Sequence, residues 1–154
     1  MNSSNLSTDI DFDGLYKKSY PLPKFSDEDN LAGQNFVNKI CPSGKFVCLN
    51  VRDEMFLRQS EPIGWTKNRD WSYHNYRDSD ISTYVKAAEA IAEMGYTVFR
   101  MGALVKEPLV SKHPRVIDYA ANGMRTEFLD IFLGAYCAFC ISTGSGWDSV
   151  PTIF

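Results

Sequence analysis

The chain has 154 residues, of which 44% are apolar and 14% aromatic, enough for one domain with a substantial core. The net charge of -3 and the pI near 5.3 argue against a non-specific nucleic-acid binder, although a local basic pocket for a small anion stays open. The N-terminal residues lack the positive start and apolar core of a signal peptide, and no apolar run approaches a membrane span. We therefore expect a cytoplasmic protein without a membrane span.

Composition divides the chain into two parts. Residues 1–25 are mostly polar and carry Pro21 and Pro23, so we expect an extended lead-in. Residues 26–154 hold the periodic apolar segments of a folded domain. Its first predicted helix begins at Ser26, a preferred N-cap residue, and ends before Pro42.

The apolar run at residues 46–51 organises the rest of the prediction. It follows a Pro-Ser-Gly turn and is rich in β-branched and aromatic residues, which indicates a buried strand. It ends at Arg52 and Asp53. Open α/β sheets bind ligands beside the carboxyl ends of their strands, so this pair is the first candidate for a functional site.

A long aromatic stretch, residues 53–79, follows that strand and contains His74 and Arg77. Connections of this length are typically functional or disordered, and the aromatic content favours an ordered functional loop. Asp78-Ser-Asp80 then has two interpretations. It resembles a metal-binding Asp-x-Asp, but it directly precedes an amphipathic helix, and capping of that helix is the favoured reading. Gly95 is expected just beyond the end of this helix.

The remaining segments complete an α/β pattern. We predict a strand over 97–101 ending in Gly102, a short strand or turn at 116–120, a helix over 125–135 and a strand over 136–141. A short helix opens at 147–150, and residues 151–154 begin a fourth strand. The pattern predicts a Rossmann-like, open, mainly parallel sheet with flanking helices. Since this last strand would be left uncovered at the final residue, we expect the domain to be truncated at its C-terminal end.

Four cysteines raise the question of metal or redox chemistry. Cys137 and Cys140 form a C-x-x-C, but positions three apart on a strand point to opposite faces and cannot hold one ion. Cys41 and Cys48 lack a matching knuckle. We expect four buried, unreactive thiols, because free cysteine packs as a small apolar residue.

The candidate chemistry is anion binding at the strand ends. Arg52 and Arg100, together with Arg77 and His74 on the loop, provide groups that match phosphate oxygens. Gly102 ends the second strand, and a Ser/Gly turn follows the third. In such a turn hydroxyl and amide groups can donate to a phosphate. Each arginine alone is equally explained as an exposed charge, and a short Ser/Gly turn is often only a tight connection. The turn residues are Ser142, Thr143, Gly144, Ser145 and Gly146.

The order of these motifs resembles a family of bacterial surface-polysaccharide glycosyltransferases, distantly similar to fucosyltransferases of GT-B architecture. The resemblance rests on FVCLNVRD, HNYRDSDI, GYTVFRMG, IDYA and STGSG, within residues 28–154. It implies the C-terminal, nucleotide-sugar-binding half of a two-domain enzyme. It also implies that Arg52 contacts the donor diphosphate, and that Asn50 stands where the fucosyltransferases have His.

The resulting hypothesis is a donor domain that transfers a sugar from a nucleoside diphosphate sugar to a cell-surface glycan, without a metal or another cofactor. Arg52 and, as a weak candidate base, Asp53 would be catalytic. His74, Arg77, Arg100, Gly102 and residues 142–146 would bind the donor. The acceptor-binding domain would lie elsewhere. The alternatives are a non-catalytic nucleotide- or partner-binding domain, an inactive fragment, or another transferase or phosphatase that uses His74.

Overall fold

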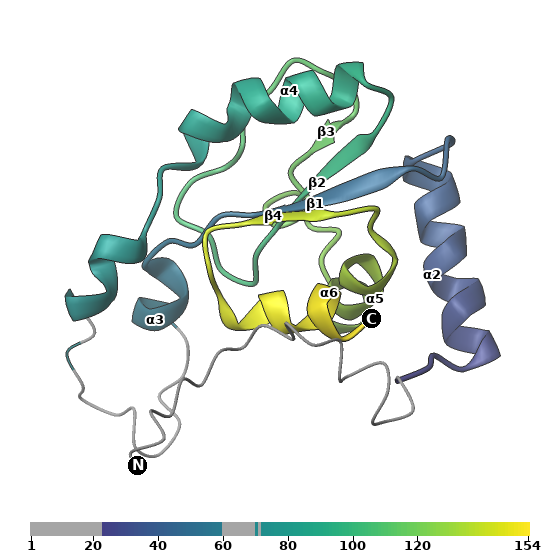
Figure 1. The fold of residues 1–154 in the computed structure, drawn as a ribbon, viewed down its shortest axis with the longest axis horizontal. Helices are drawn as coiled ribbons and strands as arrows, with labels where there is room; N and C mark the ends of the chain where they lie inside the picture. Colours follow the sequence, from purple (N-terminus) through teal and green to yellow (C-terminus); the bar gives the residue numbers. More distant parts are fainter. Residues whose placement is uncertain (1–22, 60–69, 71) are drawn as a thin grey trace, which may run out of the picture.

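A computed structural model describes residues 23–59, 70 and 72–154 (Figure 1). Its centre is a four-stranded sheet in the order β3-β2-β1-β4, and every neighbouring pair is parallel. The predicted α/β, Rossmann-like sheet is therefore confirmed. The strands are β1 (Phe46–Asn50), β2 (Thr97–Met101), β3 (Val116–Ile117) and β4 (Cys140–Ser142).

Helices cover both faces of the sheet. On one face lie α2 (Asp27–Ile40), α5 (Glu127–Tyr136) and α6 (Ser149–Ile153), and on the other lies α4 (Val85–Glu93) (Figure 1). Each face has its own apolar cluster, the first around Phe99 and Phe132, the second around Leu49 and Ala88. Burial on both sides explains why every residue of β1 and β2 is buried and no alternation shows in the sequence.

The start of the folded part lies slightly before the predicted boundary. Ser26 caps α2 as expected, since its Oγ accepts the amide of Asp29 at 3.1 Å. Phe25, however, packs against aromatic rings of α5 and against Phe154, and so belongs to the domain instead of to a lead-in. The rest of the predicted lead-in, residues 1–22, lies outside the described residues.

The amphipathic helix after residue 80 has two parts. Its first turn is a 3-10 helix, η3 (Ile81–Tyr84), and α4 continues directly from it. Asp80 is the capping residue, because its side chain accepts the amide of Ser82 at 2.8 Å. Gly95 follows the helix with φ +97°, as predicted. Met94, at the end of the helix, is 74% exposed.

The C-terminal segments correct two predictions. Helix α5 runs through Tyr136, so β4 starts only at Cys140. Residues 151–154 are not a fourth strand, because α6 spans Ser149–Ile153. Pro151 falls in the first turn of that helix, where its missing N–H has no intrahelical acceptor to lose. Phe154 stacks on Phe25 at 5.4 Å, which removes the reason for inferring an uncovered strand.

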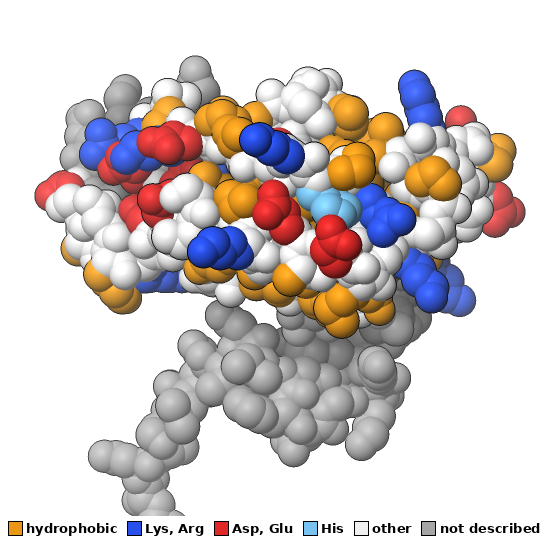
Figure 2. Space-filling model, turned by 90° about the horizontal axis from the view of Figure 1, so that it is seen from above, with side chains coloured by type: hydrophobic (Ala, Val, Ile, Leu, Met, Phe, Trp, Pro, Cys, Tyr) orange, Lys and Arg blue, Asp and Glu red, His pale blue; other side chains and the backbone are white. Residues whose placement is uncertain are grey.

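The surface over α4 mixes both signs of charge with apolar side chains (Figure 2). One contact there ties the loop before β3 to the helix, since Nε2 of His113 lies 3.3 Å from Glu93. Within the described ranges, no helix combines the length and apolar character needed to cross a bilayer.

Candidate functional site

A cavity of about 470 Å³ lies at the carboxyl edge of the sheet. Its walls come from the segments that follow β1, β2 and β4, from α3 (Met55–Gln59), and from the 3-10 helix η2 (Ser72–Arg77). The chain runs outward from β1 to β2 and β3, and then returns to place β4 on the other side of β1. Such a topological switch point is where open α/β sheets form their ligand crevice.

The structure brings most of the predicted site residues into this one cavity. Those that line it are Arg52, Asp53, His74, Arg77, Gly102, Gly144, Ser145 and Gly146. Three other predicted residues do not line it, namely Arg100, Ser142 and Thr143. Sequence reasoning therefore gathered most of these residues at one cavity, but it did not separate the residues that line the cavity from those that do not.

Arg52 is the most buried cationic side chain on the cavity wall. Its backbone is fixed by two hydrogen bonds, since its amide donates to Thr143 Oγ1 at 2.9 Å and its carbonyl accepts Ser79. The side chain is 12% exposed, and its Nε lies 3.6 Å from Asp78. Nη1 is buried without a hydrogen-bond partner among the described residues. The guanidinium thus keeps donor capacity that an anion in the cavity can use.

Arg77 and His74 reach the cavity from η2. Nη2 of Arg77 donates to the carbonyl of Gly144 at 3.2 Å, which joins η2 to the turn after β4. His74 is partly buried and its ring lies 4.1 Å from that of Tyr73. Arg52 and Arg77 thus place two guanidinium groups on the cavity lining, within a chain whose net charge is negative.

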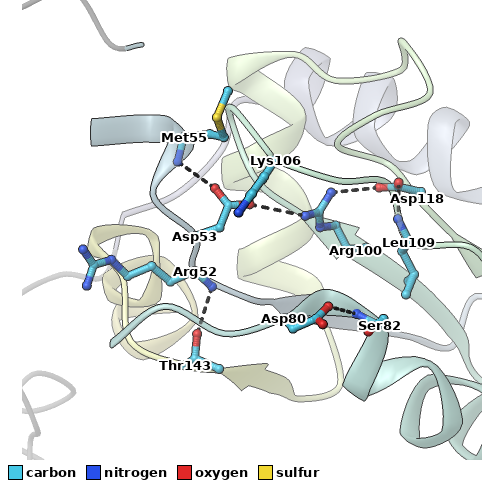
Figure 3. A network of polar contacts seen from close by, with 10 residues as sticks. All are labelled: Arg52, Asp53, Met55, Asp80, Ser82, Arg100, Lys106, Leu109, Asp118 and Thr143. Atoms are coloured by element: carbon cyan, nitrogen blue, oxygen red, sulfur yellow. Dashed lines mark hydrogen bonds and ion pairs between the residues drawn. The ribbon is translucent and has the colours of Figure 1, made fainter. Parts of the chain in front are cut away.

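Asp53 holds two cavity segments in place (Figure 3). Its Oδ1 accepts the amide of Met55 at 2.9 Å, and its Oδ2 accepts the amide of Lys106 at 2.8 Å. The first bond fixes the start of α3, and the second fixes the loop after β2. Both carboxylate oxygens are already engaged, so the geometry describes a positioning residue more directly than the base suggested from the sequence.

Arg100 lies behind the cavity wall and is fully buried. Its guanidinium is 3.3 Å from Asp118 and 3.9 Å from Asp53, whereas Arg52 extends to the opposite side (Figure 3). Asp118 also accepts the amide of Leu109 at 2.7 Å. Direct contact between Arg100 and a diphosphate, as predicted, does not fit this position. Arg100 instead compensates two carboxylates and fixes Asp53.

The Ser/Gly turn after β4 is fixed by hydrogen bonds from Asn50 and by hydrogen bonds within the turn itself. The amide nitrogen of Asn50 donates to Ser145 at 2.7 Å and to Asp148 at 3.1 Å, and lies 3.5 Å from Ser142. Ser145 caps η4 (Gly146–Asp148) in a capping box with Asp148. The amides of Gly144 and Ser145 already donate to Ser142 and Asp148. The prediction that these amides bind a diphosphate is therefore not supported, and the turn serves to shape the cavity.

Several cavity residues were missed by sequence reasoning. Apolar side chains also line the cavity, as do Asn50 and Asp130. A lining that contains both guanidinium groups and apolar side chains suits a ligand with an anionic part and a flat, less polar part. These residues were hard to identify from the sequence, because each lies in an apolar or helical segment whose pattern is already explained by packing in the core. The apolar residues are Phe56, Leu57, Leu104, Val105 and Trp147.

The Asp78-Ser-Asp80 segment does not form a metal site in the structure. Asp80 caps η3 and Asp78 faces Arg52, so the favoured capping interpretation holds for Asp80 alone. Hydrogen bonds from Ser82 hold the pKa of the exposed Asp80 below its usual value. Over the described ranges, no group of three or more His, Cys, Asp or Glu side chains could hold a metal ion.

The thiols are all free, and two of the four are buried. Cys137 ends α5 and Cys140 begins β4, so the C-x-x-C spans a helix-to-strand connection and not a strand. A hydrogen bond to Cys137 together with burial raises the pKa of Cys48, and burial raises the pKa of Cys140 to about 12. The pKa of Cys137 is lowered by the same contact with Cys48. Unreactive thiols thus fit Cys48 and Cys140 better than Cys137.

Comparisons of this chain with family models, with curated proteins and with solved structures found no significant match.

Proposed function

We propose that this chain is the donor-binding domain of a glycosyltransferase, which transfers a sugar from a nucleoside diphosphate sugar to a glycan acceptor. The observation that carries the proposal is the cavity at the switch point of a parallel sheet, whose lining contains Arg52 and Arg77 together with apolar side chains. The motif order that resembles surface-polysaccharide glycosyltransferases supports the same class.

The two kinds of lining residue suit the two ends of such a donor. Guanidinium groups bind phosphate oxygens through charge-assisted hydrogen bonds, and they remain protonated at any working pH. The apolar lining residues, which include Trp147 and Leu104, offer a surface for the nucleoside. A cavity of about 470 Å³ is within the usual range for small-molecule sites.

In the proposed reaction, the bond between the anomeric carbon and the diphosphate oxygen breaks, and its electron pair stays on the diphosphate. The acceptor hydroxyl forms the new bond to the anomeric carbon and releases its proton. Arg52 and Arg77 stabilise the negative charge that develops on the leaving diphosphate, so no metal is required for this task. The residues that bind the acceptor would belong to a further domain, as the family resemblance implies.

One observation favours a second candidate, a non-catalytic nucleotide-binding domain. Both oxygens of Asp53 accept backbone amides, so the carboxylate nominated from the sequence is committed to structure. The same cavity would then bind a nucleotide without transferring a sugar. The two candidates share ligand binding and differ only in turnover.

Isothermal titration calorimetry with UDP, GDP and dTDP tests the shared step. We expect one of them to bind the wild-type chain, and Arg52→Ala and Arg77→Ala to weaken binding by about tenfold or more each. Arg58→Ala is the matched control, because Arg58 is 66% exposed, pairs with Glu54 and lies outside the cavity lining. Equal affinity in Arg52→Ala, or no binding to a folded wild type, would contradict the proposal.

Turnover separates the two candidates. Incubation of the wild-type chain with the corresponding nucleotide sugars and a glycan mixture should release the nucleoside diphosphate and extend a glycan. Binding without release, while Arg52→Ala still abolishes binding, would favour the non-catalytic candidate.

A further inference from the structure

Asp130 is a second carboxylate on the cavity, and the chemistry described so far does not use it. It lies near the N-terminal end of α5, beside the carboxyl edge of the sheet, and it lines the cavity together with Arg52 and Arg77. Its side chain is 14% exposed. Its backbone carbonyl accepts the indole N–H of Trp147 at 3.0 Å, which fixes it to another cavity residue.

The carboxylate of Asp130 is held by side chains, whereas that of Asp53 is held by backbone amides. Tyr119 donates its hydroxyl to Oδ1 at 3.1 Å, and Nη2 of Arg125 lies 2.7 Å from Oδ2. Neither partner belongs to the cavity lining. Asp130 is therefore positioned from behind, by groups that stay in place when a ligand enters.

The surroundings of Asp130 shift the pKa of its carboxyl group in opposite directions. Burial raises the pKa of its carboxyl group, the guanidinium of Arg125 partly offsets this, and the nearby Glu127 adds to the increase. The cavity is also lined by the cations Arg52 and Arg77, by His74, and by Asp53. Desolvation by a bound ligand and a second negative charge both disfavour the ionised form of a carboxyl group.

We propose that Asp130 is the proton-exchanging residue of this cavity, which takes up a proton when a nucleotide-sugar diphosphate binds. Without a ligand, Asp130 returns to the carboxylate that pairs with Arg125. This inference rests on the proposed function, because it requires an anionic ligand in the cavity.

Linkage gives the direction of the effect. If the complex binds one more proton than the free protein, affinity rises as the pH falls, by at most about tenfold per pH unit over the range where Asp130 titrates. His74 would produce the same direction if its protonation favoured the anion. A test therefore needs to separate these two groups.

The experiment is calorimetry with UDP-glucose, GDP-mannose and dTDP-glucose between pH 5 and 8, in two buffers of different ionisation enthalpy. Nucleotide sugars are the suitable probes because they lack the terminal phosphate that titrates near pH 6. The proteins are the wild type, Asp130→Asn, and His74→Gln. Tyr119→Phe is a second Asp130 variant, since it removes a donor to the carboxylate and should move proton uptake to higher pH.

We expect proton uptake in the wild type and in His74→Gln, and none in Asp130→Asn. If Asp130→Asn does not fold, a shift of the uptake to higher pH in Tyr119→Phe supports the same assignment. Uptake that survives in Asp130→Asn, or that disappears in His74→Gln, overturns the inference while the proposed function stands. A folded wild type that binds none of the three probes at any pH overturns the proposed function itself.

Discussion

The ends of β1 and β2 both carry an arginine and lie side by side in the sheet, yet they have opposite roles. Arg100 of β2 is fully buried between Asp53 and Asp118. Arg52, just after β1, lines the cavity, with its side chain 12% exposed and one acidic neighbour at 3.6 Å. The same residue type is therefore enclosed at one strand end and lies on the cavity at the other.

The difference follows from where each side chain sits along its strand. Arg100 lies inside β2, paired in register with Leu49, and its guanidinium reaches Asp118, the residue just after β3. Arg52 follows β1 at the switch point, where β4 ends beside it. A charge one or two residues inside a buried strand must be compensated, whereas a charge past the strand end can serve a ligand.

Removal of Arg100 should produce the largest effect on stability. Arg100→Ala leaves Asp53 and Asp118 without their buried cation, and breaking such a pair costs about 3–5 kcal/mol. Urea unfolding followed by circular dichroism measures the loss. A cost below about 1 kcal/mol would mean that the two strand ends do not differ in the way the geometry indicates.

Asn50, the last residue of β1, tests how the turn after β4 is held. Asn50→Ala removes the donor to Ser145 and Asp148 and leaves these acceptors partly unsatisfied, which should cost about 1–3 kcal/mol of unfolding free energy. Asn38→Ala, at an exposed position of α2, is the control and should change stability little. Equal effects of the two substitutions would exclude a structural role of Asn50 at the switch point.

Gly144 tests the turn itself. Its φ of +92° disfavours any side chain, and a Cβ there would lie 3.6 Å from Nη2 of Arg77. Gly144→Ala should therefore cost about 1–2 kcal/mol of stability and weaken nucleoside diphosphate binding. Gly146→Ala is the matched control, because no atom lies within 4 Å of its added Cβ. Unfolding and calorimetry of the pair show whether the shape of the turn matters for the ligand.

Arg52 should show the smallest change in stability and a clear change in binding. Its ion pair with Asp78 is long and partly exposed, so Arg52→Ala should lower the unfolding free energy by no more than about 1 kcal/mol. Nucleoside diphosphate affinity should nevertheless fall by about tenfold or more. Plotting affinity against stability for Arg52→Ala and Arg100→Ala compares the two strand ends directly. If both variants lose affinity in the same proportion to their loss of stability, the two arginines do not have separate roles.

Much of the fold was predictable because it depends on local signals. The cap at Ser26, the buried runs of β1 and β2, and Gly95 after α4 each follow from residue types and spacing. The continuation of helix α6 past residue 150 was not predictable, since a five-residue helix that includes a proline shows no period. The helix follows directly on η4, whose capping box contains Asp148, and it packs against α5.

The site was predictable in position but not in detail. A parallel sheet requires strand ends to meet, which is why Arg52, Gly102 and Gly144 share one cavity. The sequence cannot show that Arg100 is enclosed by Asp53 and Asp118, because these contacts depend on neighbours set by the strand order. Asp130 was missed for a similar reason, since on α5 it resembles an ordinary acidic residue of a first helical turn.

The short ladder between β1 and β4 has a thermodynamic consequence. On β4, Cys140, Ile141 and Ser142 pair with β1, and the turn that follows them lines the cavity. A ladder of three pairs at a sheet edge opens at a smaller free energy than the central strands, so its amide protons should exchange with solvent before those of β1 and β2. A ligand that requires the closed edge would slow this exchange by an amount set by its own affinity.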